Sequence, residues 1–444
     1  MRCLPPTAHH GVLATFKFPP PLRGGSGWGV DNPSVDRQTC LSFDRQDPLA
    51  SLRDEFALPE GVIYLDGNSL GALPRQTLPR LNEVIANEWG SGLIRSWNAA
   101  HWMEAPARIG DKIARLIGAK PGEVIVADST SVNLFKLLAG ALRVQPGRHF
   151  ILTEASNFPT DVYIAQGLVD LLGGNHVLRV VERADIERSL DGSVAVVMLT
   201  HVDYATGEIH DMQRITAAAQ KVGALMLWDL SHSAGAVPID LNAAQVDLAV
   251  GCGYKYLNGG PGAPAYLFVA KGLQDAIQSP LSGWMGHAAP FAFESEYRPA
   301  PGITRQLAGS PPILSMLALE VAIDIWLRVD QKEARRKSMA LGDLFIQQVE
   351  ETCRDLGVEV VGPRDAAQRG SQVSLRHKEG YQVMRALIDR GIIGDFRTPD
   401  LMRFGFAPLY TRYVDAFDAV RGLREVLTSR AWDRPEYKTR LTVT

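Results

Sequence analysis

The chain has 444 residues, which at about 150 residues per domain predicts two or three domains. Apolar residues make up 46% and charged residues 21%, as in globular proteins, so a largely disordered chain is excluded. The formal charge of -3, from 46 Lys+Arg against 49 Asp+Glu, lacks the basic excess that binders of nucleic acid or anionic membranes need. We therefore expect neither partner.

The cysteine pattern and the apolar runs define the expected compartment. None of the four cysteines, Cys3, Cys40, Cys252 and Cys353, has the C-x-x-C spacing of a zinc or redox pair. We expect no disulfide framework and no metal, which fits the reducing cytoplasm. The longest apolar runs, such as 194–199, are far shorter than the ~18 to 20 residues of a membrane span. Prolines interrupt the N-terminus before a secretory core forms, so we expect no export signal.

The N-terminal part of the chain changes character near residue 48. Residues 1–47 are rich in Pro, Gly and Ser and show no sustained period, which predicts an extension or disordered tail. Residues 61–71 read as a short strand that runs into a turn, and 78–89 have the apolar spacing of a helix. Regular structure is therefore expected from about residue 48 onward.

The middle of the chain alternates between apolar strands and helical stretches. The predicted strands are 123–127, 150–153, 194–199, 224–228, 246–250 and 265–270. Helices are predicted at 132–142 and 212–222. This alternation predicts an α/β domain with a mostly parallel sheet, which we place at 48–310; its first ~30 residues could pack with the small domain.

Beyond residue 310 the pattern changes to long helices followed by short strands. The predicted helices are 313–329, 332–355, 380–390 and 414–427, and the predicted strands are 358–361, 372–375 and 402–406. These elements predict a smaller α+β domain at 311–444.

Polar residues follow four predicted strands, where open α/β sheets bind ligands. Lys255, between two tyrosines in a glycine-rich segment, is unusual because a buried ammonium is costly unless it is paired or covalently modified. Asp229, at the end of a neighbouring strand, could pair with a protonated pyridine nitrogen. The hydroxyls of Thr130 and Ser131, at a helix start, could hold a phosphate. Together these residues predict pyridoxal phosphate as cofactor.

The order of seven segments resembles the kynureninase family, over about residues 50–430. The segments are Ile63-Tyr-Leu-Asp-Gly-Asn-Ser-Leu-Gly71, Phe158-Pro-Thr-Asp161, Asp229-Leu-Ser-His232, Tyr254-Lys-Tyr-Leu-Asn258, Gly283-Trp-Met-Gly-His287, Ser310-Pro-Pro-Ile313 and Arg403-Phe-Gly-Phe-Ala-Pro-Leu-Tyr410. The resemblance implies a fold-type I, aminotransferase-like enzyme with a seven-stranded, mostly parallel sheet and a smaller α+β domain. It also implies a homodimer that hydrolyses L-kynurenine, or its 3-hydroxy derivative, to the anthranilate product and L-alanine in tryptophan catabolism.

The resemblance also implies roles for single residues. Lys255 would bind the cofactor aldehyde, Asp229 the pyridine nitrogen, and Arg403 the α-carboxylate of the substrate. Tyr254 would contact the phosphate and donate a proton late in the reaction. The remaining cofactor contacts would come from Thr130, Ser131, Phe158, Asp161, Thr200 and His232, with Trp284 and Ser310 reaching in from the other subunit. Some relatives carry Asn or Thr in place of Ser310.

Structural interpretations of the same residues stay open. Asp229 could cap a turn, Phe158 could pack in the core, and Arg403 could pair with a structural carboxylate. His232 could be a structural histidine, and the Ser/Thr run could serve only as a helix cap. Two further candidates for an aromatic substrate pocket, which could equally be core, are Trp97, beside Trp102, and Asn98.

Other functions remain as alternatives. A cysteine desulfurase needs a cysteine on a mobile loop, whereas Cys353 falls in a predicted helix. An aminotransferase would need an external keto acid, and a non-catalytic cofactor-binding module usually carries a basic DNA-binding domain that this chain lacks. A nicotinamide dehydrogenase is disfavoured because no G-x-G-x-x-G follows a first strand.

Overall fold

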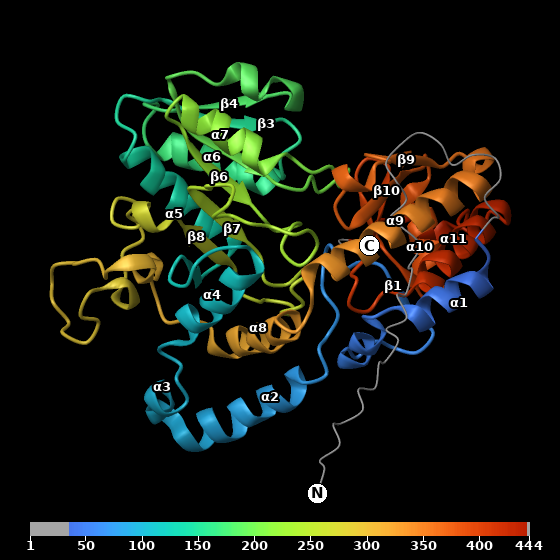
Figure 1. The fold of residues 1–444 in the computed structure, drawn as a ribbon, viewed down its shortest axis with the longest axis horizontal. Helices are drawn as coiled ribbons and strands as arrows, with labels where there is room; N and C mark the ends of the chain where they lie inside the picture. Colours follow the sequence, from blue (N-terminus) through green and yellow to red (C-terminus); the bar gives the residue numbers. More distant parts are fainter. Residues whose placement is uncertain (1–34, 442–444) are drawn as a thin grey trace, which may run out of the picture.

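The computed structural model describes residues 35–441, and Figure 1 shows two lobes joined by the long segment around helix α8 (Ile313–Trp326). The larger lobe is built on a seven-stranded sheet in the order β2-β8-β7-β6-β5-β3-β4. Its strands are β2 (Val124–Val126), β3 (Phe150–Glu154), β4 (Val177–Val181), β5 (Val194–Thr200), β6 (Leu225–Asp229), β7 (Leu248–Gly251) and β8 (Tyr266–Val269). Strands β3 to β7 are mutually parallel and β8 is antiparallel to both its neighbours. The predicted mostly parallel sheet is confirmed.

Helices cover both faces of this sheet and bury its apolar side chains. Helices α5 (Thr130–Arg143) and α6 (Pro159–Leu171) pack on one face, while α4 (Ala105–Leu116), α7 (Met212–Lys221) and α8 pack on the other. All seven residues of β5 are buried, as expected for a central strand with helices on both sides. The carboxyl ends of the parallel strands therefore remain as the edge at which polar residues can gather.

The smaller lobe contains a four-stranded antiparallel sheet in the order β12-β13-β10-β9. Its strands are β9 (Glu359–Val361), β10 (Gln372–Arg376), β12 (Asp395–Arg397) and β13 (Leu401–Gly405). Its helices are α1 (Arg37–Gln46), α9 (Gln331–Thr352), α10 (Gly380–Ile388), α11 (Tyr413–Thr428) and α12 (Pro435–Lys438). The short strand β1 (Ile63–Tyr64) joins this lobe by pairing with β11 (Ile392–Ile393).

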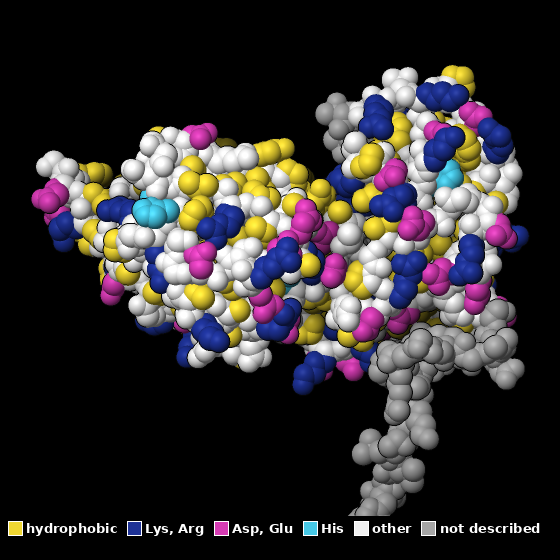
Figure 2. Space-filling model, turned by 90° about the horizontal axis from the view of Figure 1, so that it is seen from above, with side chains coloured by type: hydrophobic (Ala, Val, Ile, Leu, Met, Phe, Trp, Pro, Cys, Tyr) yellow, Lys and Arg dark blue, Asp and Glu magenta, His cyan; other side chains and the backbone are white. Residues whose placement is uncertain are grey.

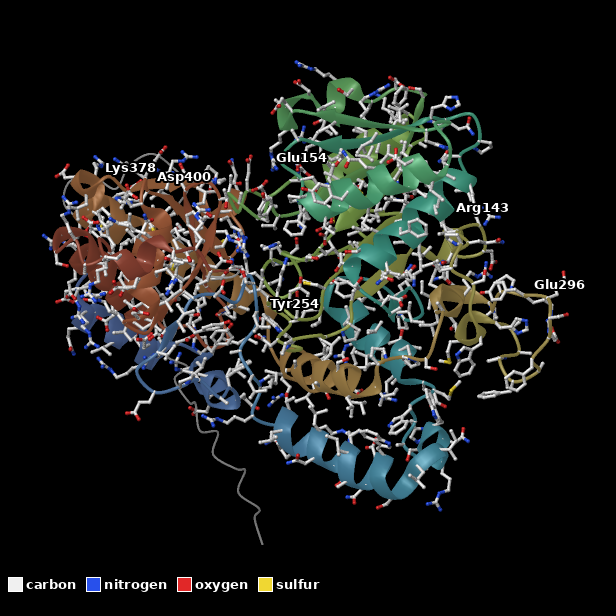
Figure 3. All side chains as sticks on the ribbon, turned by 180° about the vertical axis from the view of Figure 1, so that it is seen from behind. Arg143, Glu154, Tyr254, Glu296, Lys378 and Asp400 are labelled. Atoms are coloured by element: carbon white, nitrogen blue, oxygen red, sulfur yellow. The ribbon has the colours of Figure 1, made fainter. Side chains whose placement is uncertain are left out.

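A projecting segment completes the larger lobe. It consists of α2 (Thr77–Glu83), a π-helical stretch (Val84–Gly92) and α3 (Ser96–Ala99), and α2 runs beside α8 at the lower edge of Figure 1. A second projection, the loop that carries Glu296, extends away from the body in Figure 3. No helix in residues 35–441 has the length and apolar character that crossing a bilayer requires.

The structure corrects two of the expected domain limits. Residues 1–34 of the expected extension lie outside the described residues, but 37–46 form α1, which packs against α11. Asp36 caps α1, and Asp44 accepts hydrogen bonds from the backbone N–H groups of Tyr413 and Val414 at the start of α11. The predicted boundary at residue 310 puts helix α8 in the small domain, yet its buried apolar residues pack in the core of the larger lobe, so the division falls after α8, near Asp330.

Candidate active site

Lys255 follows strand β7 and lies in the interior with only 9% of its surface exposed. Its Nζ atom is 2.8 Å from Nε2 of His232, which follows β6. Burial lowers the pKa of His232 well below its ordinary value, and the positive charge of Lys255 lowers it further. The imidazole is therefore neutral and accepts a hydrogen bond from the lysine ammonium.

Two buried aspartates lie beside this pair, one at the end of a strand and one in the first turn of a helix. Asp229 ends β6, where it pairs in register with Thr200 at the end of β5. Asp161 lies in the first turn of α6, and its Oδ2 is 3.5 Å from Oγ1 of Thr200. Burial raises the pKa of both carboxyls, and the charge of Lys255 lowers both. The charge of Asp229 and the hydrogen bond between the two carboxyls raise the pKa of Asp161, whereas the same hydrogen bond lowers that of Asp229. Asp229 is therefore the more acidic carboxyl of the pair.

Phe158 precedes α6 and faces the same space. Its ring centroid is 5.7 Å from Nζ of Lys255, and its ring meets that of Tyr204 edge to face at 5.2 Å. Asn157, a buried residue, accepts hydrogen bonds from the backbone N–H of Phe158 and from Oγ1 of Thr200. Asn157 thus links the backbone at Phe158 to the side chain of Thr200 at the end of β5.

The N-terminus of α5 forms the far end of the site. Ser129 caps this helix by accepting from the N–H of Val132, and Thr130 and Ser131 form its first turn. Ser129, Tyr254 and Ser310 all line one cavity of about 430 Å³. The unpaired N–H groups of a helix start bind anions such as phosphate. Tyr254 lies near the junction of the two lobes in Figure 3, and Figure 2 shows a hollow between the lobes.

Arg403 is buried on β13 and is already engaged by a carboxylate. Its Nε donates to Oδ1 of Asp395 at 2.8 Å, and Nη2 donates to the other oxygen of Asp395. Nη1 donates to the carbonyl of Tyr204 at 2.7 Å and Nη2 to Oγ of Ser69 at 3.0 Å. The pairing with a structural carboxylate, one of the interpretations left open by the sequence, therefore exists in this protein, and it leaves one N–H on Nη1.

Four of the expected site residues form no hydrogen bond or ring contact with Lys255 within residues 35–441. Trp284 contacts Trp97 with ring centroids 6.5 Å apart, and Trp97 contacts Trp102 at 5.9 Å. Asn98, next to Trp97, is exposed. Ser310 is also exposed, but it lines the cavity of its own chain that holds Ser129.

Sequence reasoning missed three residues of this site. Asn157 directly precedes the segment Phe158-Pro-Thr-Asp161, but nothing in the sequence shows that it accepts a hydrogen bond from Thr200. Asp395 contacts Arg403 because β12 and β13 pair with Asp395 opposite Arg403, and Ser69, which follows β1, accepts a hydrogen bond from the same guanidinium. The signal for this hairpin is Thr398-Pro-Asp400, which separates two short strands.

The sequence of this chain is similar to those of one family of known proteins. A model of the kynureninase C-terminal domain matches residues 334–423. Kynureninase of Burkholderia pseudomallei strain 1106a is 55% identical over 413 residues, which cover 92% of this chain and 99% of the relative. Kynureninase of Pseudomonas fluorescens is 54% identical over the same shares of both chains.

Solved structures are similar in fold. A cysteine desulfurase from Thermococcus onnurineus NA1 has a TM-score of 0.72 at 21% identity, covering 85% of this chain and 98% of its own. A cysteine desulfurase from Escherichia coli has a TM-score of 0.71 at 18% identity, covering 86% and 98%. In this chain Cys353 ends α9 and is fully buried, and burial raises the pKa of its thiol, so it lacks the mobile thiolate of a desulfurase. The identity with curated relatives over nearly the full length decides the family: the chain belongs to the kynureninases.

Proposed function

We propose that this protein is a pyridoxal-phosphate-dependent hydrolase that cleaves the Cβ–Cγ bond of L-kynurenine, or of 3-hydroxy-L-kynurenine. The products are anthranilate or its 3-hydroxy derivative, and L-alanine. The observation that carries the proposal is the buried Lys255–His232 pair next to the Asp229 carboxylate, at adjacent strand ends of a kynureninase-family chain.

The residues at this edge fit the cofactor at each of its functional groups. Lys255 offers the amine for the aldehyde, Asp229 a buried carboxylate for the pyridine nitrogen, and the start of α5 a set of N–H groups for the phosphate. Phe158 provides an aromatic face, and Asp161 and Thr200 provide hydrogen-bonding groups beside Asp229. Bound pyridoxal phosphate supplies an electron sink for the carbon atoms of the substrate.

The chain's own groups hold and move the protons. Neutral His232 accepts a hydrogen bond from Nζ of Lys255 and so orients the amine that removes the α-proton. Burial raises the pKa of Asp229, whereas the charge of Lys255 and the hydrogen bonds of Ser231 and Asp161 lower it, so these neighbours favour a negative charge where the pyridine nitrogen would bind. Burial raises the pKa of Tyr254, so its hydroxyl stays protonated and could donate a proton to Cβ, which takes the electron pair when the Cβ–Cγ bond breaks after water adds to the γ-carbonyl.

Arg403 provides the charge that binds the α-carboxylate. Asp395 and Ser69 hold one edge of the guanidinium, and one N–H on Nη1, which has no partner within residues 35–441, is available for substrate. A charged hydrogen bond of this kind orients the Cα–H bond for Lys255 and excludes substrates that lack a carboxylate.

The proposed enzyme is a homodimer whose active sites receive Trp284 from the second subunit, while Ser310 lines the cavity of its own chain. Ile94 and Phe293 are 78% and 82% exposed, and such large apolar side chains on projecting segments fit burial against a second copy. Because Trp97 contacts Trp284, both would serve the same site, with Asn98 at its rim. The three free cysteines of the described chain, Cys40, Cys252 and Cys353, fit a cytoplasmic location.

The test is direct. Purified protein with pyridoxal phosphate is mixed with L-kynurenine, and anthranilate is followed by its fluorescence, with Lys255→Ala as the matched control. We expect product from the wild type and none from the control. An assay with cysteine as the sole substrate tests the desulfurase alternative, and an assay with kynurenine and an added keto acid tests the aminotransferase alternative. Turnover on either, without anthranilate from kynurenine, would overturn the proposal, and kcat/KM for both ketones ranks the two substrates.

A further inference from the structure

A fully buried lysine lies behind the helix start that is proposed to hold the phosphate. Lys136, on the second turn of α5, has no exposed side-chain surface. Its Nζ donates to Oδ2 of Asp128 at 2.6 Å and to the backbone carbonyl of Gln306 at 2.6 Å. Burial lowers the pKa of Lys136, while the carboxylate of Asp128 raises it. A buried cation in this place needs its partner to be ionised.

Asp128, the partner of Lys136, lies at the edge of the cavity. It immediately precedes the cap residue Ser129, its backbone has a φ of +48°, and its side chain is 33% exposed. It lines the 430 Å³ cavity together with Ser129, Tyr254 and Ser310. A free carboxylate there would repel an anion at the N-terminus of α5 and cancel the attraction of the helix dipole.

Lys136 acts on both walls of this cavity at once. Through Asp128 it holds the turn that presents Ser129 and the first N–H groups of α5. Through the carbonyl of Gln306 it holds the segment that continues to Ser310. The ammonium therefore fixes the distance between the two segments and supplies the positive charge that balances Asp128.

We propose that Lys136 is a positioning residue for the cofactor phosphate, which neutralises Asp128 and joins the α5 start to the Gln306–Ser310 segment. This inference rests on the proposed function, because it places the phosphate at α5. It concerns the phosphate alone and predicts no effect on the part of the site that holds the aldehyde and the ring.

The experiment compares pyridoxal phosphate with pyridoxal, which has the same ring and aldehyde but no phosphate. Dissociation constants of both are measured on cofactor-free protein by the visible absorbance of the bound form. For Lys136→Met we expect the preference for the phosphorylated form to fall by about tenfold or more. Lys136→Arg retains the charge and is expected to retain most of the preference. Asp128→Asn in the Lys136→Met background removes the unbalanced carboxylate and is expected to restore much of it.

A second variant keeps the inference testable if Lys136→Met fails to fold. Asp128→Asn alone leaves the ammonium unbalanced beside the cavity and is expected to increase the preference for pyridoxal phosphate. Equal weakening of both ligands in Lys136→Met, or a selective loss of the phosphorylated ligand in Asp128→Asn, would overturn the inference. Failure of the wild type to bind either ligand would instead overturn the proposed function, so the two failures are distinguishable.

Discussion

Replacement of Arg403 by methionine tests how the substrate carboxylate is bound. A guanidinium has five N–H donors. Four of those of Arg403 are engaged by Asp395, Tyr204 and Ser69, so within the described chain one, on Nη1, remains for the substrate. One charged hydrogen bond contributes about 1.5 to 3 kcal/mol. Since about 1.4 kcal/mol is a factor of ten, kcat/KM for kynurenine is expected to fall roughly 10- to 150-fold.

The matched control for this variant is Arg397→Met. Arg397 is bonded to the same partners, with Nη2 at 2.8 Å from Asp395 and 3.2 Å from Ser69, but its side chain is 36% exposed. A partly exposed pair contributes about 0 to 1 kcal/mol, so kcat/KM is expected to change by no more than about fivefold. Steady-state anthranilate formation measures both variants. Equal losses in the two variants, or an unchanged kcat/KM in Arg403→Met, would refute the reasoning.

Three further predictions use other parts of the molecule. Asp229→Asn is expected to lower kcat by about 10²- to 10³-fold while cofactor absorbance persists; full activity would contradict its role. A mixture of the Lys255→Ala and Trp284→Ala proteins is expected to regain about one quarter of wild-type activity if Trp284 acts across a two-fold dimer, because each mixed dimer then contains one intact site. No recovery of activity would show that Trp284 serves the site of its own subunit. Burial lowers the pKa of His201 to about 3 in the folded protein. Between about pH 6.5 and 3 the unfolded chain binds a proton at this residue and the folded protein does not, so the free energy of unfolding decreases as pH falls through this range. Urea unfolding of His201→Gln should therefore lose stability less steeply over that range, by about 1.4 kcal/mol per pH unit, and identical slopes would contradict this.

The central strands were predictable because burial on both faces demands continuous apolar runs. Strands β5 and β6 match the expected 194–199 and 224–228 to within one residue. The edge strand β4 was missed because Arg179 interrupts its short apolar run and its outer side is exposed. Helix α1 was missed because it follows a long segment of Pro, Gly and Ser, and its packing partner α11 lies nearly 370 residues later.

The site residues that directly follow a strand could be predicted from the sequence. Lys255, Asp229 and His232 come together because β6 and β7 are neighbours in a parallel sheet, which the alternating pattern already indicates. The engagement of Arg403 by Asp395 was not predictable, because it depends on the pairing register of two short strands. The contact between Trp97 and Trp284 joins segments far apart in the chain, and no local pattern reports it.

The most direct measurement is the site at which the cofactor attaches. The protein is incubated with pyridoxal phosphate, reduced with borohydride, digested, and its peptides are weighed by mass spectrometry. The account predicts a single pyridoxyl group on the ε-nitrogen of Lys255. A stable label on any other lysine, or an unlabelled peptide at this position in protein that turns over kynurenine, would contradict it.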